Sequence, residues 1–182
     1  MFATEQTNVF GLVRMCQLVL PEMRRKGWGR IINVSSMGGE MTIPFASFYH
    51  ATKYAVESLS DGLRIEVQPF GIDVVVIQPG GINTPLGHQT VAAIPTEMGS
   101  AYAEALRGFR HVSNLAIQAA QMMVTPDQVA QVILEAIQAD HPLTRYKVNT
   151  NDTRTVNQER DVTDRQRDAA FRQQFGLTNP QS

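Results

Sequence analysis

The chain has 182 residues, of which 43% are hydrophobic and 18% charged, so it can bury a core and extensive disorder is not expected. Its 16 basic residues nearly balance 17 acidic ones, which argues against a polyanionic partner such as nucleic acid. The single cysteine, Cys16, excludes an internal disulfide framework or thiolate metal site, and we expect it to pack as a small apolar residue.

No apolar run is long enough to cross a membrane, and the N-terminus lacks a basic stretch followed by an apolar one. We therefore expect a cytoplasmic protein without a signal peptide. Its length predicts one domain, or most of one.

The first half of the chain alternates helical and strand patterns. A helix is predicted over residues 4–26, and Pro21 should kink or end it. A short strand, rich in β-branched residues, is predicted over 31–35, and a second helix over 47–67. Residues 72–77 are nearly all apolar, as expected of a parallel strand buried on both faces.

The second half is less regular. Weak helical patterns run over 97–110 and 113–123. The letters T-P-D-Q at 125–128 predict a capping box with proline in the first turn of a helix. A short strand is expected over 145–149 and an amphipathic helix over 163–175. Helices alternating with strands in this way predict an α/β fold with a parallel sheet.

Tyr49 and Lys53 lie four positions apart in the second helix, so they share one face of it. A free phenol, with a pKa near ~10, is a poor acid or base at neutral pH, but a nearby ammonium favours the phenolate. A hydroxyl from Ser35 or Ser36, after the preceding strand, could hold a carbonyl or an alcohol against the phenol. Proton transfer is one interpretation of the pair. The other is a contact that stabilises one helical turn by about 0.2–0.5 kcal/mol.

Five motifs occur in a fixed order: N-V-F-G (8–11), L-P-E-M (20–23), G-R-I-I-N-V-S-S-M-G-G (29–39), Y-H-A-T-K (49–53) and G-I-D-V-V-V-I-Q-P-G-G-I-N-T (71–84). Together they resemble the short-chain dehydrogenase/reductase family. The resemblance implies a Rossmann-like, doubly wound parallel sheet. It also implies an oxidoreductase that uses NAD or NADP to transfer a hydride to or from an alcohol or carbonyl substrate.

The resemblance also implies roles for residues at matching positions. Tyr49 is implied as the proton donor and acceptor at the substrate oxygen. Lys53 is implied to favour ionisation of that tyrosine and to hydrogen-bond the nicotinamide ribose. Ser36 matches the substrate-orienting serine better than Ser35 does. Asn8 matches a helix asparagine that anchors a water and links Lys53 to a proton relay.

The loop after the second strand is implied to contact the cofactor. The residues expected there are Pro79, Gly80, Ile82 (through its backbone) and Thr84, the last two at the nicotinamide carboxamide. Residues 86–124 correspond to the substrate-binding segment of the family. Their apolar content, with that of residues 41–48, suggests a lipophilic alcohol or ketone.

A dinucleotide site also needs a first strand, a glycine-rich turn and a helix N-terminus for the pyrophosphate, and this sequence holds no such unit. We therefore expect one partial domain over 1–182, in which Met1 aligns with the interior of a family member. The N-terminal half of the sheet would be missing, and the strand at 31–35 would have an open edge.

Three interpretations stay open. The chain is a fragment or mis-started form of an active oxidoreductase, or another chain supplies the other half. Alternatively, it is a short, cofactor-free product that acts as a dimerisation module through helices 4–26 and 47–67.

Other residues have simpler interpretations. No metal-ligand spacing is found among His50, His88, His111 and His141, which we expect to be ordinary exposed or packed residues. Trp28 is expected to anchor a turn, and the basic residues 24–26 to complement a helix dipole. Residues 150–182 form a polar extension that includes the terminal helix.

Overall fold

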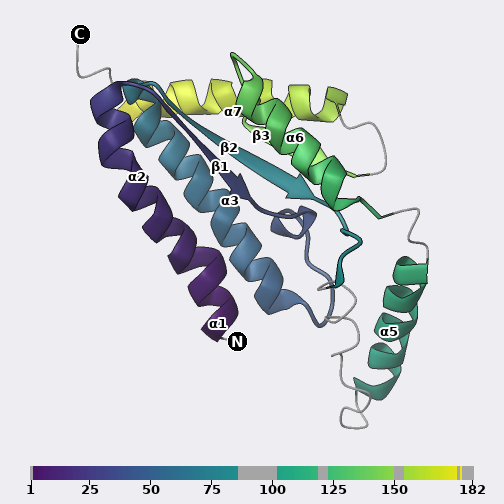
Figure 1. Cartoon of the computed structure of the whole chain (residues 1–182). Coiled ribbons are helices and arrows are strands. Elements are labelled where there is room, and N and C mark those ends of the chain that lie inside the picture. The colour runs from purple at the N-terminus through teal and green to yellow at the C-terminus, as the bar shows by residue number, and fades with distance from the viewer. Residues whose placement is uncertain (1, 86–101, 119–122, 150–153, 176, 178–182) are drawn as a thin grey trace.

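The computed structural model describes residues 2–85, 102–118, 123–149, 154–175 and 177. Its helices and strands are shown in Figure 1. In chain order they are α1 (Phe2–Glu5), the π-helical segment η1 (Gln6–Gly11), α2 (Leu12–Lys26), β1 (Gly29–Val34), the 3-10 segment η2 (Met37–Gly39), α3 (Ser47–Val67), the 3-10 segment η3 (Gln68–Phe70), β2 (Ile72–Pro79), α5 (Ala103–Gln118), α6 (Pro126–Gln138), β3 (Arg145–Val148) and α7 (Arg154–Phe175).

The three strands form one parallel sheet in the order β1-β2-β3, with Ile31 opposite Val74 and Ile77 opposite Tyr146. Helices α2 and α3 cover one face, α6 covers the other, and α7 lies against α3 and β3 (Figure 1). The predicted α/β fold with a parallel sheet is therefore confirmed. Within the part of the chain that the structure describes, β1 is an edge strand.

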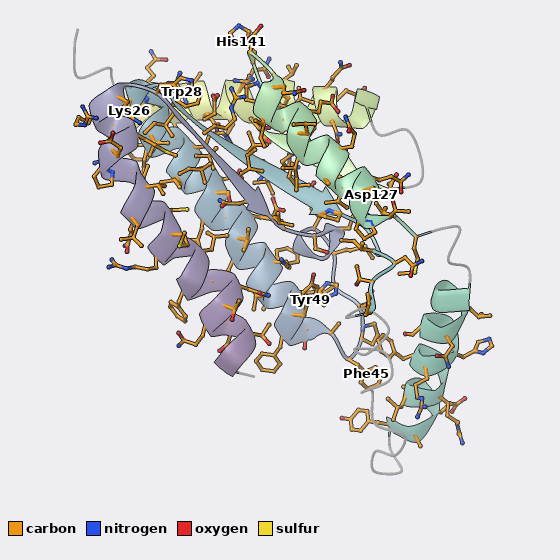
Figure 2. The ribbon with its side chains drawn as sticks, in the orientation of Figure 1. Lys26, Trp28, Phe45, Tyr49, Asp127 and His141 are labelled. Carbon is orange, nitrogen blue, oxygen red and sulfur yellow. The ribbon has the colours of Figure 1, made fainter. Side chains whose placement is uncertain are left out.

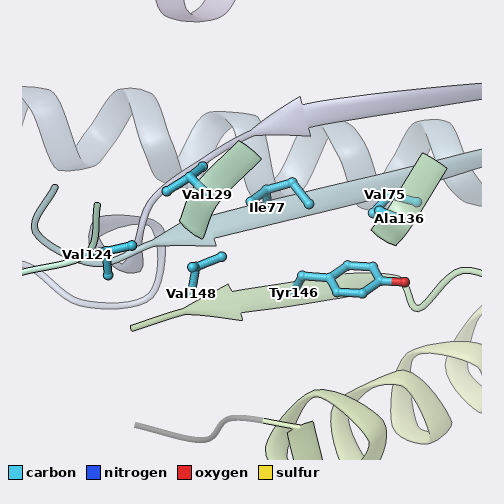
Figure 3. Packing of buried hydrophobic residues seen from close by; sticks show 7 residues of the cluster. All are labelled: Val75, Ile77, Val124, Val129, Ala136, Tyr146 and Val148. Carbon is cyan, nitrogen blue, oxygen red and sulfur yellow. The ribbon is translucent and has the colours of Figure 1, made fainter. Parts of the chain in front are cut away.

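The core has one cluster on each face of the sheet, because successive side chains of β2 point to opposite sides. On the α2 and α3 face the buried cluster contains Cys16, Ile31, Val67, Ile72 and Val74. On the α6 face, drawn in Figure 3, it contains Val75, Ile77, Val124, Val129, Ala136, Tyr146 and Val148. The expectations that β2 is buried on both faces and that Cys16 packs in the core are confirmed.

The first helix differs in part from its prediction. It is interrupted by the π-helical η1, and it continues through Pro21 to Lys26 instead of ending at the proline. Pro21 is exposed, so water can reach the carbonyl that the proline leaves without its usual donor. The helix ends at Gly27, whose φ of 66° is left-handed. Trp28 is 65% exposed, so the expectation that its ring anchors this turn is wrong.

Helix α3 has the predicted bounds, and Thr125 and Gln128 form the predicted capping box at the start of α6. Where two weak helices were expected over 97–110 and 113–123, the structure has the single helix α5; residues 86–101 and 119–122 lie outside the described residues.

Helix α7 begins at Arg154, nine residues before the expected Thr163. Its first turns are polar, which is why apolar periodicity did not predict them. Their side chains bond the backbone of β3 and of the residue before it: Asn157 Oδ1 accepts from the N–H of Lys147 at 2.9 Å, and Asp161 Oδ1 accepts from the N–H of Thr144 at 2.7 Å.

Candidate functional site

Tyr49 and Lys53 come together on the first turns of α3, near the end of β1. The Lys53 ammonium nitrogen lies 5.8 Å from the centre of the Tyr49 ring and donates to the carbonyl of Val34 at 3.0 Å. Burial lowers the pKa of Lys53, and the carboxylate of Glu57 partly opposes that shift. The phenol of Tyr49, which Figure 2 labels, is 42% exposed and open to a ligand.

Asn8 is tied to the same helix from η1. Its amide nitrogen donates to the Thr52 hydroxyl at 3.1 Å, and that hydroxyl donates to the Tyr49 carbonyl at 2.7 Å. Asn8, Lys53 and Val34 also line one open groove of about 600 Å³ along β1. The structure thus brings Asn8 into the neighbourhood of the Tyr49–Lys53 pair, although Asn8 precedes Tyr49 by 41 positions in the sequence.

The two candidate serines have different surroundings. Ser35 is buried, and its hydroxyl has no hydrogen-bond partner among the described residues. Ser36 is partly exposed, and its hydroxyl accepts from the N–H of Gly38 at 3.0 Å. Of the two, Ser36 is the one that a ligand can reach.

The segment after β2 lies beside the serine loop. Pro79 is the last residue of β2 and not the first of a loop, because the N–H of Gly80 continues the pairing by donating to the Val148 carbonyl at 2.8 Å. A side chain on Gly80 would lie 3.3 Å from the sulfur of Met37, so a glycine allows this close approach. Ile82 pairs with Val124, and Thr84 is partly exposed.

The histidines form no metal site in the described parts of the chain, where no group of three His, Cys, Asp or Glu could hold an ion. His50 is buried, bonds the Met41 carbonyl through Nδ1, and lies edge-on to the Tyr49 ring with 5.6 Å between centres. His111 and His141 are exposed, and His88 lies outside the described residues.

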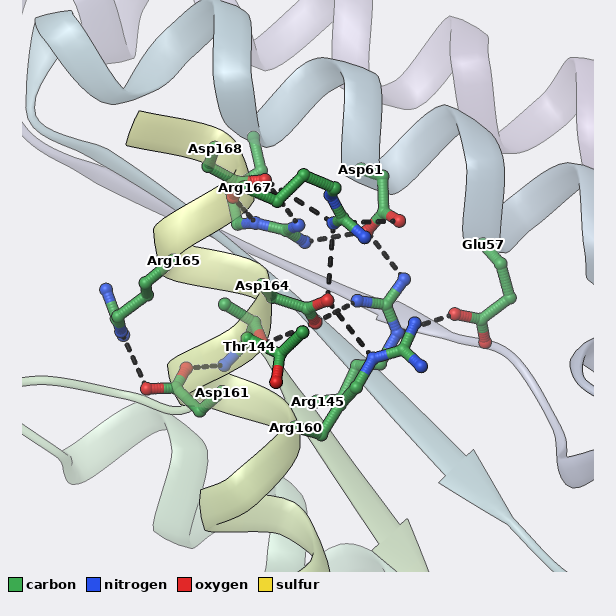
Figure 4. A network of polar contacts seen from close by, with 12 residues as sticks. Glu57, Asp61, Thr144, Arg145, Arg160, Asp161, Asp164, Arg165, Arg167 and Asp168 are labelled. Carbon is green, nitrogen blue, oxygen red and sulfur yellow. Dashed lines mark hydrogen bonds and ion pairs between the residues drawn. The ribbon is translucent and has the colours of Figure 1, made fainter. Parts of the chain in front are cut away.

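Sequence reasoning missed three buried polar residues behind this site, Glu57, Gln78 and Arg145. Their side chains bond one another, and Figure 4 shows Glu57 and Arg145 within the wider polar network. A signal was available in the sequence. Gln78 directly follows the apolar run 74–77 within β2, and the carboxylate of Glu57 follows Lys53 at helical spacing.

The candidate residues suit one end of a dinucleotide better than the other. Ligands of doubly wound sheets bind at the C-terminal ends of the parallel strands, where Ser36, Tyr49, Lys53 and Gly80 lie. A partly exposed ammonium there fits a ribose hydroxyl. The sequence holds no glycine-rich turn between a strand and a helix that would take a pyrophosphate. The fit therefore extends to the nicotinamide and its ribose.

A parallel sheet covered by helices, with the candidate residues at the C-terminal ends of its strands, is the arrangement of a Rossmann-like fold. A family model described as short chain dehydrogenase matches residues 3–95, just over half of the 182 residues. The chain belongs to the short-chain dehydrogenase family.

Two curated relatives illustrate the similarity. The chain is 55% identical to the 3-ketodihydrosphingosine reductase of Bacteroides thetaiotaomicron over 78 residues, covering 43% of this chain and 29% of that protein. It is 34% identical to human 17-beta-hydroxysteroid dehydrogenase type 1 over 143 residues, covering 76% of this chain and 43% of that protein. Across eight such relatives, the chain covers between 29% and 57% of the relative's length.

Among solved structures, a short-chain dehydrogenase from Streptomyces avermitilis aligns with a TM-score of 0.61 at 28% identity, covering 93% of this chain and 58% of that one. In the described residues, no helix combines the length and apolar character needed to span a bilayer.

Proposed function

We propose that this chain carries the catalytic residues of an NAD- or NADP-dependent oxidoreductase acting on an alcohol or a carbonyl compound, with Tyr49 as its acid and base. The observation that carries the proposal is the placement of the Lys53 ammonium 5.8 Å from the Tyr49 ring, held there by the Val34 carbonyl. Family membership supports the same reaction class.

In this mechanism, a bound nicotinamide supplies or accepts the hydride. In the reductive direction the Tyr49 hydroxyl donates its proton to the substrate oxygen, and in the oxidative direction the phenolate takes that proton back. The Lys53 ammonium would stabilise the phenolate and would hold the nicotinamide ribose. The Ser36 hydroxyl orients the substrate oxygen. Asn8 would connect Lys53 to a proton relay, and Ile82 and Thr84 would hold the carboxamide of the nicotinamide.

We expect the substrate to be lipophilic. Four apolar side chains between the serine loop and Tyr49 are exposed: Met41, Ile43, Phe45 and Phe48. The Phe45 ring packs at 5.3 Å from the ring of Phe109 on α5, which gives this side of the site an aromatic wall. The relatives named above, for a ketodihydrosphingosine and for hydroxysteroids, are consistent with such a substrate.

The test is Tyr49→Phe in the protein as its source organism makes it. Loss of a positioned proton donor should reduce turnover by about 10²–10⁴-fold while the circular dichroism spectrum stays the same. Tyr54→Phe is the matched control, because Tyr54 lies on the same helix with 44% exposure against 42% for Tyr49. Full activity in the Tyr49 variant would refute the assignment.

A second candidate function is an interaction module. It is favoured by the exposed faces of η1 with α2, and of α3. Five large apolar or aromatic side chains there are exposed: Phe10, Met15, Leu18, Tyr54 and Leu59. Single exposed apolar residues are common, but a group on neighbouring helices is typical of a protein interface. Cofactor binding separates the candidates, because an interaction module alone should bind no NAD or NADP.

A further inference from the structure

Glu57 lies on α3 one turn after Lys53, and its carboxylate is held at both oxygens. Oε1 accepts from the amide of Gln78 on β2 at 2.9 Å, and Oε2 accepts from Nε of Arg145 on β3 at 2.9 Å. Glu57 is only 8% exposed, so both bonds lie in a largely water-free environment. A carboxylate fixed in this way keeps its position relative to Lys53, which lies one turn earlier on α3.

The same carboxylic side chain packs against the serine loop. A Cβ added to Gly39 would lie 2.8 Å from Cγ of Glu57 and 2.8 Å from the hydroxyl of Ser35. The Gln78 amide also donates to Glu40 at 3.1 Å, at the end of that loop. Glu57 therefore lies on the helix that carries Tyr49 and Lys53 and contacts the loop that carries Ser36.

Arg145 is itself anchored from two other elements, as Figure 4 shows. Its guanidinium forms ion pairs of 2.5 Å with Asp61 on α3 and 2.5 Å with Asp164 on α7, and it is 2% exposed. Because three carboxylates share this one cation, removal of a single carboxylate leaves Arg145 with two partners. Glu57 and Asp61 can thus be compared within one network.

From this geometry we propose that Glu57 is a positioning residue for the catalytic site, whose fixed carboxylate sets the electrostatic environment of Lys53 and holds the loop of Ser36 against α3. The proposal rests on the function proposed above for Lys53 and Ser36. It also assigns a role to Gln78 on β2 and Arg145 on β3, which hold Glu57 in place, and to Asp164 on α7, which holds Arg145.

The charges around Lys53 agree with this role. Burial lowers the pKa of Lys53, whereas Glu57 raises it. The other charged groups of this region are Arg14 on α2, which lines the same groove, Glu40 after η2, and Arg145 and Lys147 on β3. Glu40 is paired with Lys147 at 2.6 Å, and Arg145 is shared among three carboxylates. Glu57 is the anion closest to Lys53 along α3.

The experiment is competitive amine labelling of the full chain as a function of pH, read by mass spectrometry for each lysine. In Glu57→Gln, loss of the carboxylate should move the labelling midpoint of Lys53 to lower pH. Its labelling rate below the midpoint should then rise by about twofold or more. The exposed Lys26 serves as an internal reference that should not move.

Asp61→Asn is the matched control, because it also removes one partner of Arg145 but lies a further turn from Lys53. It should leave the Lys53 midpoint in place. Amide exchange of residues 35–40 should accelerate in Glu57→Gln and not in Asp61→Asn. Equal midpoints and equal exchange in the two variants would overturn the proposal, leaving Glu57 a purely structural role.

Both variants are also made in a Gly62→Ala background, where the added methyl group meets open space and favours the helix. If Glu57→Gln fails to fold in either background while Asp61→Asn folds, the positioning role is likewise overturned. The labelling needs no cofactor or substrate, so its outcome is independent of whether Tyr49→Phe abolishes turnover.

Discussion

Gly39 determines how closely the serine loop approaches the catalytic helix. It lies in the short η2 segment and is buried beneath Glu57 and Ser35. No side chain fits between these groups, because a Cβ would come within 2.8 Å of each. The spacing of the candidate catalytic groups therefore depends on the absence of one methyl group.

We predict that Gly39→Ala destabilises the protein by about 1–3 kcal/mol, the usual range for an overpacked buried site. Gly62→Ala should instead stabilise it by up to about 1 kcal/mol, because alanine is the better helix former and the site is open. Urea unfolding of both variants measures the difference. A Gly39 variant as stable as the parent would show that the loop can move away from α3 without cost.

At the scale of elements, α7 is held by charged rather than apolar side chains. Asp164 is fully buried, accepts from the Thr144 hydroxyl at 2.9 Å and pairs with Arg145. Asp168 pairs with Arg64 at 2.6 Å. Burial would raise the pKa of Asp164, but Arg145 and the Thr144 hydrogen bond outweigh it, so the net pKa lies below the ordinary value of 3.8.

The pH dependence of the protein's stability follows from the lowered pKa of Asp164. A carboxylate with a lowered pKa in the folded state contributes stability that is fully present above 3.8 and is lost as the pH falls through its folded-state pKa. Asp164→Asn should therefore lower the free energy of unfolding by about 3 kcal/mol at neutral pH, as expected when one partner of a buried pair is removed. The variant should also lose part of the acid sensitivity of the parent.

Urea unfolding at neutral and acidic pH tests this prediction. Glu22→Gln provides the control, because Glu22 pairs with Arg25 and Lys26 on the exposed side of α2 and should change little. A loss of stability in the Asp164 variant that is the same at every pH would contradict the assigned charge state.

The elements also show which parts of the fold are predictable from sequence. Periodicity predicted β2 because its buried side chains are mostly apolar, and capping chemistry predicted the start of α6. Periodicity also predicted the bounds of α3, although most of the side chains that α3 buries are polar, among them Glu57 and Arg64. The early turns of α7 were not predicted, because they pack against β3 through polar hydrogen bonds and not through apolar side chains. Tyr49 and Lys53 are local neighbours, whereas the Asn8–Thr52 bond and the Glu57–Arg145 pair join residues far apart in the chain. Such long-range polar pairs leave no periodic signal.

For the whole molecule, the outer faces of α2 and α3 carry apolar side chains that the described chain does not cover. Leu18, which lies on α2, is 56% exposed. A shallow hollow of about 340 Å³ between the two helices is lined in part by Leu20, Leu59 and Leu63. We propose that a second copy of the chain covers this surface.

We predict that sedimentation velocity will show a concentration-dependent dimer, and that Leu18→Glu will shift it to monomer because a charge would be buried at the contact. Val162→Glu is the control, since Val162 on α7 is also 56% exposed but lies on another helix. A parent chain that stays monomeric at high concentration, or equal behaviour of the two variants, would exclude this surface as the interface.

The π-helical segment η1 has a consequence for aligning the chain with its relatives. A π turn contains one residue more than an α turn, so Gln6–Gly11 is equivalent to a single-residue insertion in a regular helix. Deleting one residue there would restore α geometry but turn the preceding residues by about 100° around the axis. It would also shift Asn8 relative to Thr52. A relative with an uninterrupted helix should therefore show a one-residue gap at this point, and a pairwise alignment that ignores the gap will assign the wrong residue to the position of Asn8.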